Sequence, residues 1–279
     1  MHFVLPSRRV MLGAAAVILW LPAAPAADDD ILFERESPYV PSPQDVVDRM
    51  LDFAGLRAGD LVIDLGSGDG RIVVTAARRG ARGFGVDINP DLVKEARQNA
   101  AKAGVSDRAT FEVRDLFKTD ISRADVLTLY LLPLTNLDLR PHILAQMRPG
   151  ARIVAHAYHL GDDWLPDATD NIRGRTLYYW VVPAQVGGRW RVTTEEVDFT
   201  LDIAQTFQTF RAGAHVDART LPKNVPARTT EVRDGRLDGA EIRFMVDLGD
   251  WWRVFRGRVD GDTIYGIAPR GWSAKRIKQ

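Results

Sequence analysis

The fold of this chain is decided by residues 61–70, which read LVIDLGSGDG. The first half of this stretch, 61–65, is a short apolar run of the kind that forms a buried parallel strand. It runs directly into three closely spaced glycines, and residues 71–79 are then expected to form a helix. A strand that turns through glycines into a helix is typical of the first unit of a sheet with parallel strands.

The same alternation of strand and helix continues along the chain. Further strands are expected at 83–87, 110–113, 125–132 and 151–155. Asn89 and Pro90 predict that a helix begins after the strand at 83–87. Ser42 with Pro43 predicts another helix start before the strand at 61–65. The pattern predicts an α/β fold with a doubly wound, Rossmann-like, mostly parallel sheet.

Composition narrows the class of protein. The chain has 279 residues, of which 46% are hydrophobic and 27% charged, as in an ordinary globular protein. Its 37 basic and 37 acidic residues balance, so we expect no nucleic-acid partner held by charge alone. The absence of cysteine excludes disulfides, thiolate nucleophiles and thiolate zinc sites, and no other metal site is expected.

Residues 1–27 have the pattern of a targeting segment. Arg8 and Arg9 precede an uncharged run over 10–27, which contains the small-residue stop Ala24-Pro25-Ala26. The pattern predicts a bacterial signal peptide, of twin-arginine type, and the alternative is an uncleaved membrane anchor. Both interpretations place the body of the protein in the periplasm or at the inner membrane.

The last part of the chain, 176–279, is predicted to be a smaller antiparallel β domain that follows an α/β domain at 28–175. Residues 236–244 (RLDGAEIRF) are echoed by 258–266 (RVDGDTIYG), and Asp-Gly pairs between alternating strands predict hairpins. We expect a meander or a small barrel. Four aromatic side chains are expected to fill its core, or alternatively to line an apolar cup: Trp251, Trp252, Phe255 and Trp272.

The glycine turn predicts a ligand at the carboxyl ends of the strands. Its glycines are spaced G-x-G-x-G, one position shorter than the dinucleotide fingerprint, and Arg71 fills the expected third slot. The carboxylate of Asp64 at the strand end would repel a pyrophosphate, whereas it suits a cationic amino-acid ligand. The sulfonium and amino groups of S-adenosylmethionine meet this requirement.

We therefore predict an S-adenosylmethionine site. The turn contributes four residues: Asp64, Gly66, Gly68 and Gly70. Asp87 stands where an acid accepts both ribose hydroxyls, and Asp115 is placed to accept from the adenine amino group. Each acid alone has a structural alternative, since Asp87 could cap a turn and Asp115 a helix, but their order on successive strands favours the cofactor.

Several motifs then resemble a known family. Residues 64–70 look like motif I of the class I S-adenosylmethionine-dependent methyltransferases. The set as a whole resembles the lysine methyltransferases that modify the ATP synthase c subunit and the adenine nucleotide carrier, together with their bacterial relatives. It comprises YVPSP at 39–43, DLGSGDGRIV at 64–73, LYLLP at 129–133, RPGAR at 148–152, and His156 with Gly161-Asp162. The resemblance covers about residues 38–166, and Asp163 stands where the family pattern leads directly to tryptophan.

The resemblance implies an enzyme that N-methylates a protein lysine by in-line displacement. Tyr39 and Val40 would then close over the cofactor. Tyr130 is the candidate catalytic residue, lining an aromatic channel for the lysine, with Pro133 and Asn136 shaping the mouth of that channel. The structural alternative for Tyr130 is an aromatic side chain of the core at the end of the sheet. His156 is interpreted as structural or as lying on the substrate side.

The export signal and the cofactor conflict, because S-adenosylmethionine is made in the cytosol. Three interpretations remain: a methyltransferase of a protein, membrane proteins included, or of a small molecule; an exported, non-catalytic binding protein on a methyltransferase scaffold; or an enzyme anchored with its body in the cytosol beside a membrane substrate. The complete set of cofactor residues favours an enzyme. The N-terminal segment also predicts membrane association.

Overall fold

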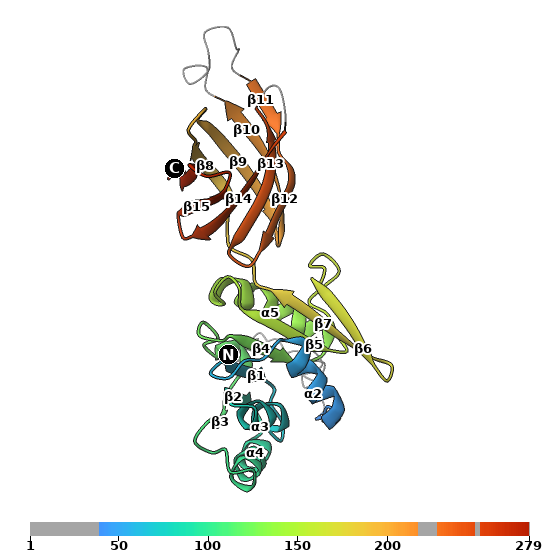
Figure 1. The fold of residues 1–279 in the computed structure, drawn as a ribbon. Helices are drawn as coiled ribbons and strands as arrows, with labels where there is room; N and C mark the ends of the chain where they lie inside the picture. Colours follow the sequence, from blue (N-terminus) through green and yellow to red (C-terminus); the bar gives the residue numbers. More distant parts are fainter. Residues whose placement is uncertain (1–38, 217–227, 249–251, 279) are drawn as a thin grey trace, which may run out of the picture. The chain divides into compact units, whose positions relative to one another are not determined.

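The computed structural model describes residues 39–216, 228–248 and 252–278. These residues form an α/β sheet and an antiparallel barrel, both coloured along the chain in Figure 1. The segment predicted to be a signal peptide or anchor lies outside the described residues. Within the described ranges, no helix combines the length and the apolar composition needed to cross a bilayer.

The first sheet has seven strands in the order β3-β2-β1-β4-β5-β7-β6. Strands β1 to β5 pair in parallel, and β7 and β6 extend the sheet as an antiparallel edge. The strands are β1 Leu61–Leu65, β2 Arg82–Asp87, β3 Ala109–Val113, β4 Val126–Leu129, β5 Arg152–His156, β6 Ala168–Ile172 and β7 Arg175–Val181. This arrangement confirms the predicted doubly wound, mostly parallel sheet.

Helices cover both faces of this sheet. On one face α2 and α3 pack against Val62 and Val126, while α5 packs on the other against Ile63 and Leu127. Helix α4 packs against α3 and against Phe111 of β3. Asn89 caps α4 as predicted, because its side chain accepts hydrogen bonds from the first turn. The helices are α2 Gln44–Phe53, α3 Arg71–Arg78, α4 Pro90–Lys102 and α5 Pro133–Gln146, with a 3-10 turn η1 at Leu116–Lys118.

The structure differs from the sequence-based expectations at three points. Strand β4 ends at Leu129 rather than 132, because Pro133 begins α5 and the intervening residues leave the sheet. Ser42 does not cap α2, whose preceding residue is Pro43 without a side-chain cap. The domain boundary expected after residue 175 falls inside the first sheet, because residues 177–181 of β7 pair with β5.

The second sheet closes into a barrel. Its strands follow the order β11-β10-β12-β13-β14-β15-β16-β8-β9, and pairing of β9 with β10 joins the two sides into a ring of eight. Strand β11 adds to the outside of this ring by pairing with β10. The strands are β8 Gly188–Thr193, β9 Phe199–Thr206, β10 Thr209–Val216, β11 Arg228–Glu231, β12 Arg233–Asp238, β13 Glu241–Asp247, β14 Trp252–Asp260, β15 Thr263–Ala268 and β16 Ser273–Arg276.

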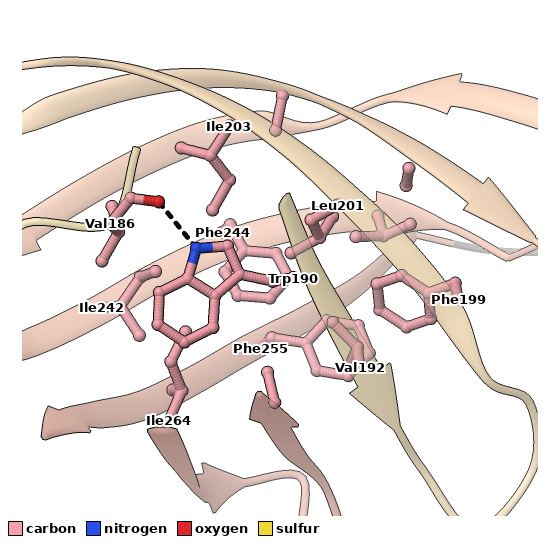
Figure 2. Close-up of a cluster of buried hydrophobic side chains, with 14 of the residues drawn as sticks. Val186, Trp190, Val192, Phe199, Leu201, Ile203, Ile242, Phe244, Phe255 and Ile264 are labelled. Carbon is pink, nitrogen blue, oxygen red and sulfur yellow. Dashed lines mark hydrogen bonds between the residues drawn. The ribbon is translucent and has the colours of Figure 1, made fainter. Parts of the chain in front are cut away.

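Aromatic and aliphatic side chains fill the barrel interior, as Figure 2 shows. Phe244 and Phe255 stack with ring centroids 5.1 Å apart, and Trp272 meets both rings edge-on. The indole of Trp190 is fully buried and donates to the carbonyl of Val186 at 2.7 Å. These side chains make a packed core, not a ligand cup.

Two of the four aromatic residues expected in that core are not observed there. Trp252 occupies an outward position on β14 and is 37% exposed, because alternate residues of a strand point to opposite faces and Phe255 takes the inward phase. Its expected place in the core is therefore wrong. Trp251 lies outside the described residues.

Candidate active site

The glycine turn between β1 and α3 forms a tight cradle. Gly68 and Gly70 have positive φ angles of 52° and 77°, which side chains other than glycine rarely adopt. A Cβ atom on Gly70 would lie 2.6 Å from the ring of Phe111 and 2.8 Å from Ala96. The turn therefore needs glycine both for its backbone angles and for its close approach to β3 and α4. Its backbone N–H groups precede the N-terminus of a helix, where anionic or polar ligand groups are favoured.

Asp87, the last residue of β2, braces this turn. One carboxylate oxygen accepts from the backbone N–H of Gly68 at 2.9 Å, and the other accepts from that of Asn89 at 2.9 Å. A carboxylate has about four acceptor positions, so both oxygens keep capacity for further donors such as hydroxyls. Asp87 therefore does cap the turn, as the structural alternative expected. Its oxygens also keep acceptor capacity for the predicted ribose contact.

Asp115 lies beyond the end of β3, the strand next to β2. Its side chain accepts from the backbone N–H of Phe117 at 2.9 Å and so caps η1. Its second oxygen lies 3.6 Å from the ammonium nitrogen of Lys118. The structural role of this acid is visible, and its role towards an adenine amino group stays a prediction.

Asp64 is the buried acid of the site. It is 2% exposed and accepts a hydrogen bond from the hydroxyl of Thr128 on β4 at 2.7 Å. Burial raises the pKa of this carboxyl to about 7, because the charged form is poorly solvated there. A cationic group placed next to Asp64 would favour its charged form, as expected for a ligand with an ammonium or sulfonium centre.

The residues of the turn fit S-adenosylmethionine better than a dinucleotide. The guanidinium of Arg71, the cation of this turn, is held by Asp69 at 2.6 Å and by the carbonyl of Ser42 at 2.8 Å, so it is already engaged. The hydroxyl of Ser67 is buried and has no hydrogen-bond partner among the described residues. An unsatisfied hydroxyl inside a glycine cradle suits a polar amino-acid group of a ligand. S-adenosylmethionine bound there would supply a methyl group on an electrophilic sulfonium.

Tyr39 and Val40 lie in front of α2, next to this turn. A Cβ atom on Gly68 would clash with the Tyr39 ring, so the ring lies against the glycine turn. The Tyr39 hydroxyl interacts with Asp69, and the pKa of the tyrosine is raised, mainly by burial and then by the charge of that carboxylate. Both residues are substantially exposed, at 45% and 56%. Their predicted closure over the cofactor is compatible with this position.

A second group of side chains gathers at the ends of β4 and β5. The rings of Tyr130 and His156 pack with centroids 4.0 Å apart. The Nδ1 atom of His156 lies 2.9 Å from the hydroxyl of Ser42, a residue 114 positions away in the sequence. Burial lowers the pKa of His156 to about 4, with a smaller effect from Arg175, so the imidazole is neutral at neutral pH. The sequence carries no signal for the Ser42 contact, because nothing local links the two residues.

The two residues expected at the channel mouth differ in burial. Pro133 begins α5 and is exposed. Asn136 is completely buried, and its amide NH₂ donates to the carbonyls of Tyr158 at 3.2 Å and His159 at 3.5 Å. Because the NH₂ is fixed by two carbonyls, its Oδ1 atom must face the other way, and that atom has no partner among the described residues. Asn136 thus has a buried acceptor atom, and its place at the channel mouth stays a prediction.

Comparison with known proteins agrees with this geometry. Residues 64–168 match the family model described as the ANTKMT methyltransferase domain. A protein-lysine N-methyltransferase of Saccharolobus islandicus is 39% identical over 151 residues, which are 52% of this chain and 93% of that protein. A lysine N-methyltransferase of the ATP synthase c subunit, from Xenopus laevis, is 32% identical over 56% of this chain and 68% of its own length.

Among solved structures, an RNA methyltransferase of Salinibacter ruber in complex with S-adenosyl-L-homocysteine is 52% identical, with a TM-score of 0.52. The match covers 53% of this chain and 96% of that one. The family match ends before the barrel begins. A glycine cradle, two acids on successive strand ends and these matches lead to one assignment: the chain belongs to the ANTKMT methyltransferase family and is a class I S-adenosylmethionine-dependent methyltransferase.

Proposed function

We propose that this enzyme is a protein-lysine N-methyltransferase. The observation that carries the proposal is the Oδ1 atom of Asn136, a buried acceptor without a partner among the described residues at the edge of the sheet where the cofactor residues end. A nucleophilic amine has N–H groups to donate to such an acceptor, whereas a carbon nucleophile has none. The names of the Saccharolobus and Xenopus relatives support lysine as the amine.

Methyl transfer to lysine requires a neutral amine and its alignment with the methyl group more than it requires acid–base catalysis. A lysine has a pKa of about 10.4, so releasing its proton costs roughly 4 kcal/mol near neutral pH. An apolar, aromatic surrounding lowers this cost by disfavouring the ammonium form. The packed rings of Tyr130 and His156 provide such a surrounding, and the neutral state of His156 adds no positive charge to it. S-adenosylmethionine bound at the glycine turn would supply the electrophilic methyl group, and the role of these rings would be to hold the neutral amine in line with it.

His156 is not placed here as the proton acceptor. A base with a pKa of about 4 holds a proton poorly at neutral pH. Its Nδ1 is also engaged with Ser42, which anchors the segment that follows Tyr39 and Val40 to the end of β5. We assign His156 and Ser42 to positioning, with the lysine proton leaving to water before transfer.

RNA is the second candidate acceptor, because the Salinibacter structure carries that description at 52% identity. The balance of 37 basic and 37 acidic residues argues against it, since RNA-binding surfaces carry an excess of positive charge. A direct assay therefore has to include both classes of acceptor.

We further propose a membrane protein as the natural acceptor, with the apolar run 10–27 holding the enzyme at the membrane. The Xenopus relative is named for an ATP synthase component, which supports an acceptor of this kind. Mass spectrometry of the N-terminus of protein isolated from cells tests the anchor. Met1 at the terminus supports it, while Ala27 at the terminus indicates cleavage and export.

The activity is tested by incubating the purified full chain with S-adenosylmethionine and, separately, host membranes, host soluble protein and host RNA. Methylated lysine in peptides from the membrane or soluble sample, found by tandem mass spectrometry, is the expected result. Methylated nucleosides without methylated lysine would replace the proposal by RNA methylation. Cofactor binding with no transfer to any sample would favour the non-catalytic binding protein.

Asn136→Leu sharpens the same assay. Loss of the buried acceptor is expected to lower kcat/KM for lysine about tenfold, equivalent to about 1.4 kcal/mol, with the cofactor Kd unchanged. Leu137→Ala, at an exposed position of the same helix, is the matched control. An unchanged kcat/KM in a folded Asn136→Leu variant would remove the acceptor role.

A further inference from the structure

The outer surface of the barrel carries a group of side chains that the fold itself does not explain. Alternate residues of β13, β14 and β15 point outward, and on these adjacent strands they combine arginines with large apolar side chains. This basic–apolar face consists of Arg243, Val254, Arg256, Arg258, Tyr265 and Ile267.

Two arginines of this face lie directly opposite one another. Arg243 and Arg256 are direct cross-strand partners, and like charges in that position are destabilising. Neither has an ion-pair partner in the described part of the chain, whereas Arg236, on the other side of Arg243, pairs with Asp167 at 3.5 Å. Glu241 lies opposite Arg258, and Asp260 follows two positions along β14 on the same outward face. The excess of positive charge would be balanced by an anionic partner outside the chain.

The apolar members are unusually open for side chains of their size. Tyr265 is 57% exposed, Ile267 55% and Val254 37%. Tyr265 stands directly opposite Arg258, so the apolar and cationic side chains form one surface. Arginine next to exposed tyrosine and aliphatic side chains is the combination that binds the headgroup region of an anionic bilayer.

Two observations favour lipid over single-stranded nucleic acid as the partner. Bases need free aromatic faces for stacking, but the guanidinium of Arg233 already lies 4.2 Å from the ring centroid of Trp252, the neighbouring exposed indole. Val254 and Ile267 present aliphatic groups, which bury in a bilayer interface but do not stack on bases.

We propose that the basic–apolar face docks the barrel on the surface of an anionic phospholipid bilayer. This binding site is separate from the methyl-transfer site and does not depend on which acceptor the enzyme uses. Each arginine near such a surface contributes about 1 kcal/mol, or about fivefold in partitioning.

The absence of cysteine allows a position-specific test on the full chain. Ser273 is exposed and lies opposite Tyr265 on β16, so Ser273→Cys places one environment-sensitive fluorophore beside the face. Ala204→Cys, at an exposed outward position of β9, places the same label across the ring from β14. Because each label reports its own surroundings, membrane binding through residues 10–27 does not mimic the signal.

The expected result is a blue shift of the Ser273→Cys label with mixed phosphatidylcholine–phosphatidylglycerol vesicles, none with phosphatidylcholine alone, and none for the Ala204→Cys label. Adding Arg243→Gln and Arg256→Gln should raise the lipid concentration for half-maximal shift roughly 25-fold. Arg243→Lys with Arg256→Lys keeps the charge and should restore the shift. Thermal unfolding checks that every variant is folded.

Three results would overturn the proposal. One is no shift at Ser273→Cys on anionic vesicles, and another is an equal shift at both labelled positions. The third is a shift with single-stranded oligouridine but not with vesicles, which would assign the face to nucleic acid instead.

Discussion

The carboxyl edge of the α/β sheet and the interior of the barrel differ in whether their buried polar side-chain atoms have hydrogen-bond partners. In the barrel, the indole N–H groups of Trp190 and Trp272 both donate to backbone carbonyls. In the α/β domain, some buried side-chain atoms have no partner although others, such as the Asp64 carboxylate, are hydrogen-bonded. Within the described residues all four atoms without a partner belong to that domain: Ser67 Oγ, Thr135 Oγ1, Asn136 Oδ1 and Trp164 Nε1.

The contrast separates a region built for stability from one built for function. A buried polar atom without a partner costs about 1–3 kcal/mol, so a fold tolerates it where a ligand or substrate completes the bond. Ser67 and Asn136 meet that description, since one lies in the glycine cradle and the other beside the end of β5. The described part of the barrel interior has no comparable group, which agrees with its role as a packed core.

The largest expected effect comes from opening the barrel core. Phe244→Ala removes a fully buried ring stacked on Phe255 and should lower the free energy of unfolding by about 4 kcal/mol. Urea denaturation measures this loss, and titration of the folded variant should give an unchanged cofactor Kd. Tyr265→Ala on the outer face is the control, with a change within about 0.5 kcal/mol. A large change in cofactor affinity in Phe244→Ala would break the separation of the two regions.

At the carboxyl edge of the sheet, a substitution is expected to lower cofactor affinity. Asp87→Ala removes the brace of the glycine turn and the predicted ribose acceptor, so cofactor affinity should fall at least tenfold, or about 1.4 kcal/mol. Calorimetric titration of S-adenosylmethionine measures it. Asp91→Ala, an exposed acid in the first turn of α4, should bind normally. Equal affinities for Asp87→Ala and the unmodified protein would remove Asp87 from the cofactor site.

Asp64 and His156 should give opposite pH dependences of stability. The pKa of Asp64 is raised to about 7, so above the unfolded value of about 3.9 the folded chain keeps a proton that the unfolded chain has lost. Stability then falls as pH rises through that window, by about 1.4 kcal/mol per pH unit. The pKa of His156 is lowered to about 4, so the unfolded chain binds the extra proton below about pH 6.5 and stability falls as pH falls.

Over the shared window these two contributions offset each other in the unmodified protein. Asp64→Asn keeps the bond to Thr128 and should leave a stability that rises with pH, while His156→Phe should leave one that falls. Urea denaturation at about pH 5 and about pH 6.5 separates the slopes. Parallel curves for both variants and the unmodified protein would show that the two groups titrate normally.

The smallest effect tests the helix at the same edge. Asn89 caps α4 by accepting from the N–H groups of Asp91 and Leu92, and Asn89→Ala should cost about 1 kcal/mol of stability. Thermal unfolding measures this, and Asn89→Ser, which retains an acceptor, should recover most of it. A loss as large as that of Phe244→Ala would mean that the edge contributes to stability as the barrel core does.

Much of the α/β domain could be predicted because its signals are local. The strand at 61–65, the glycine turn and the Asn89 cap each depend on neighbouring residues, and all three occur as expected. Residues 168–181 could not be assigned to the same sheet from their pattern. An antiparallel edge strand carries no local mark of the sheet it joins, and β7 pairs with β5 across a long stretch of intervening chain.

The positions of the acids in the predicted cofactor site follow from the sequence pattern more directly than the contacts around Asn136. Asp64 is the penultimate residue of β1 and Asp87 is the last residue of β2, so parallel pairing alone brings them to one edge. The acceptor half depends on Ser42 meeting His156 and on the amide of Asn136 meeting the carbonyls of Tyr158 and His159. Such contacts follow from helix packing on the sheet and have no periodicity in the sequence.

Hydrophobic periodicity and turn chemistry act over a few residues, so the parallel sheet, the glycine cradle and the order of its acids follow from the sequence alone. Tertiary structure alone decided that the C-terminal strands close into a ring through β9 and β10, and that Phe255 points inward while Trp252 points outward. It also decided which buried atoms stay unpaired. These outcomes depend on which distant strands pair and in which register, and a shift of one residue would exchange the inner and outer faces.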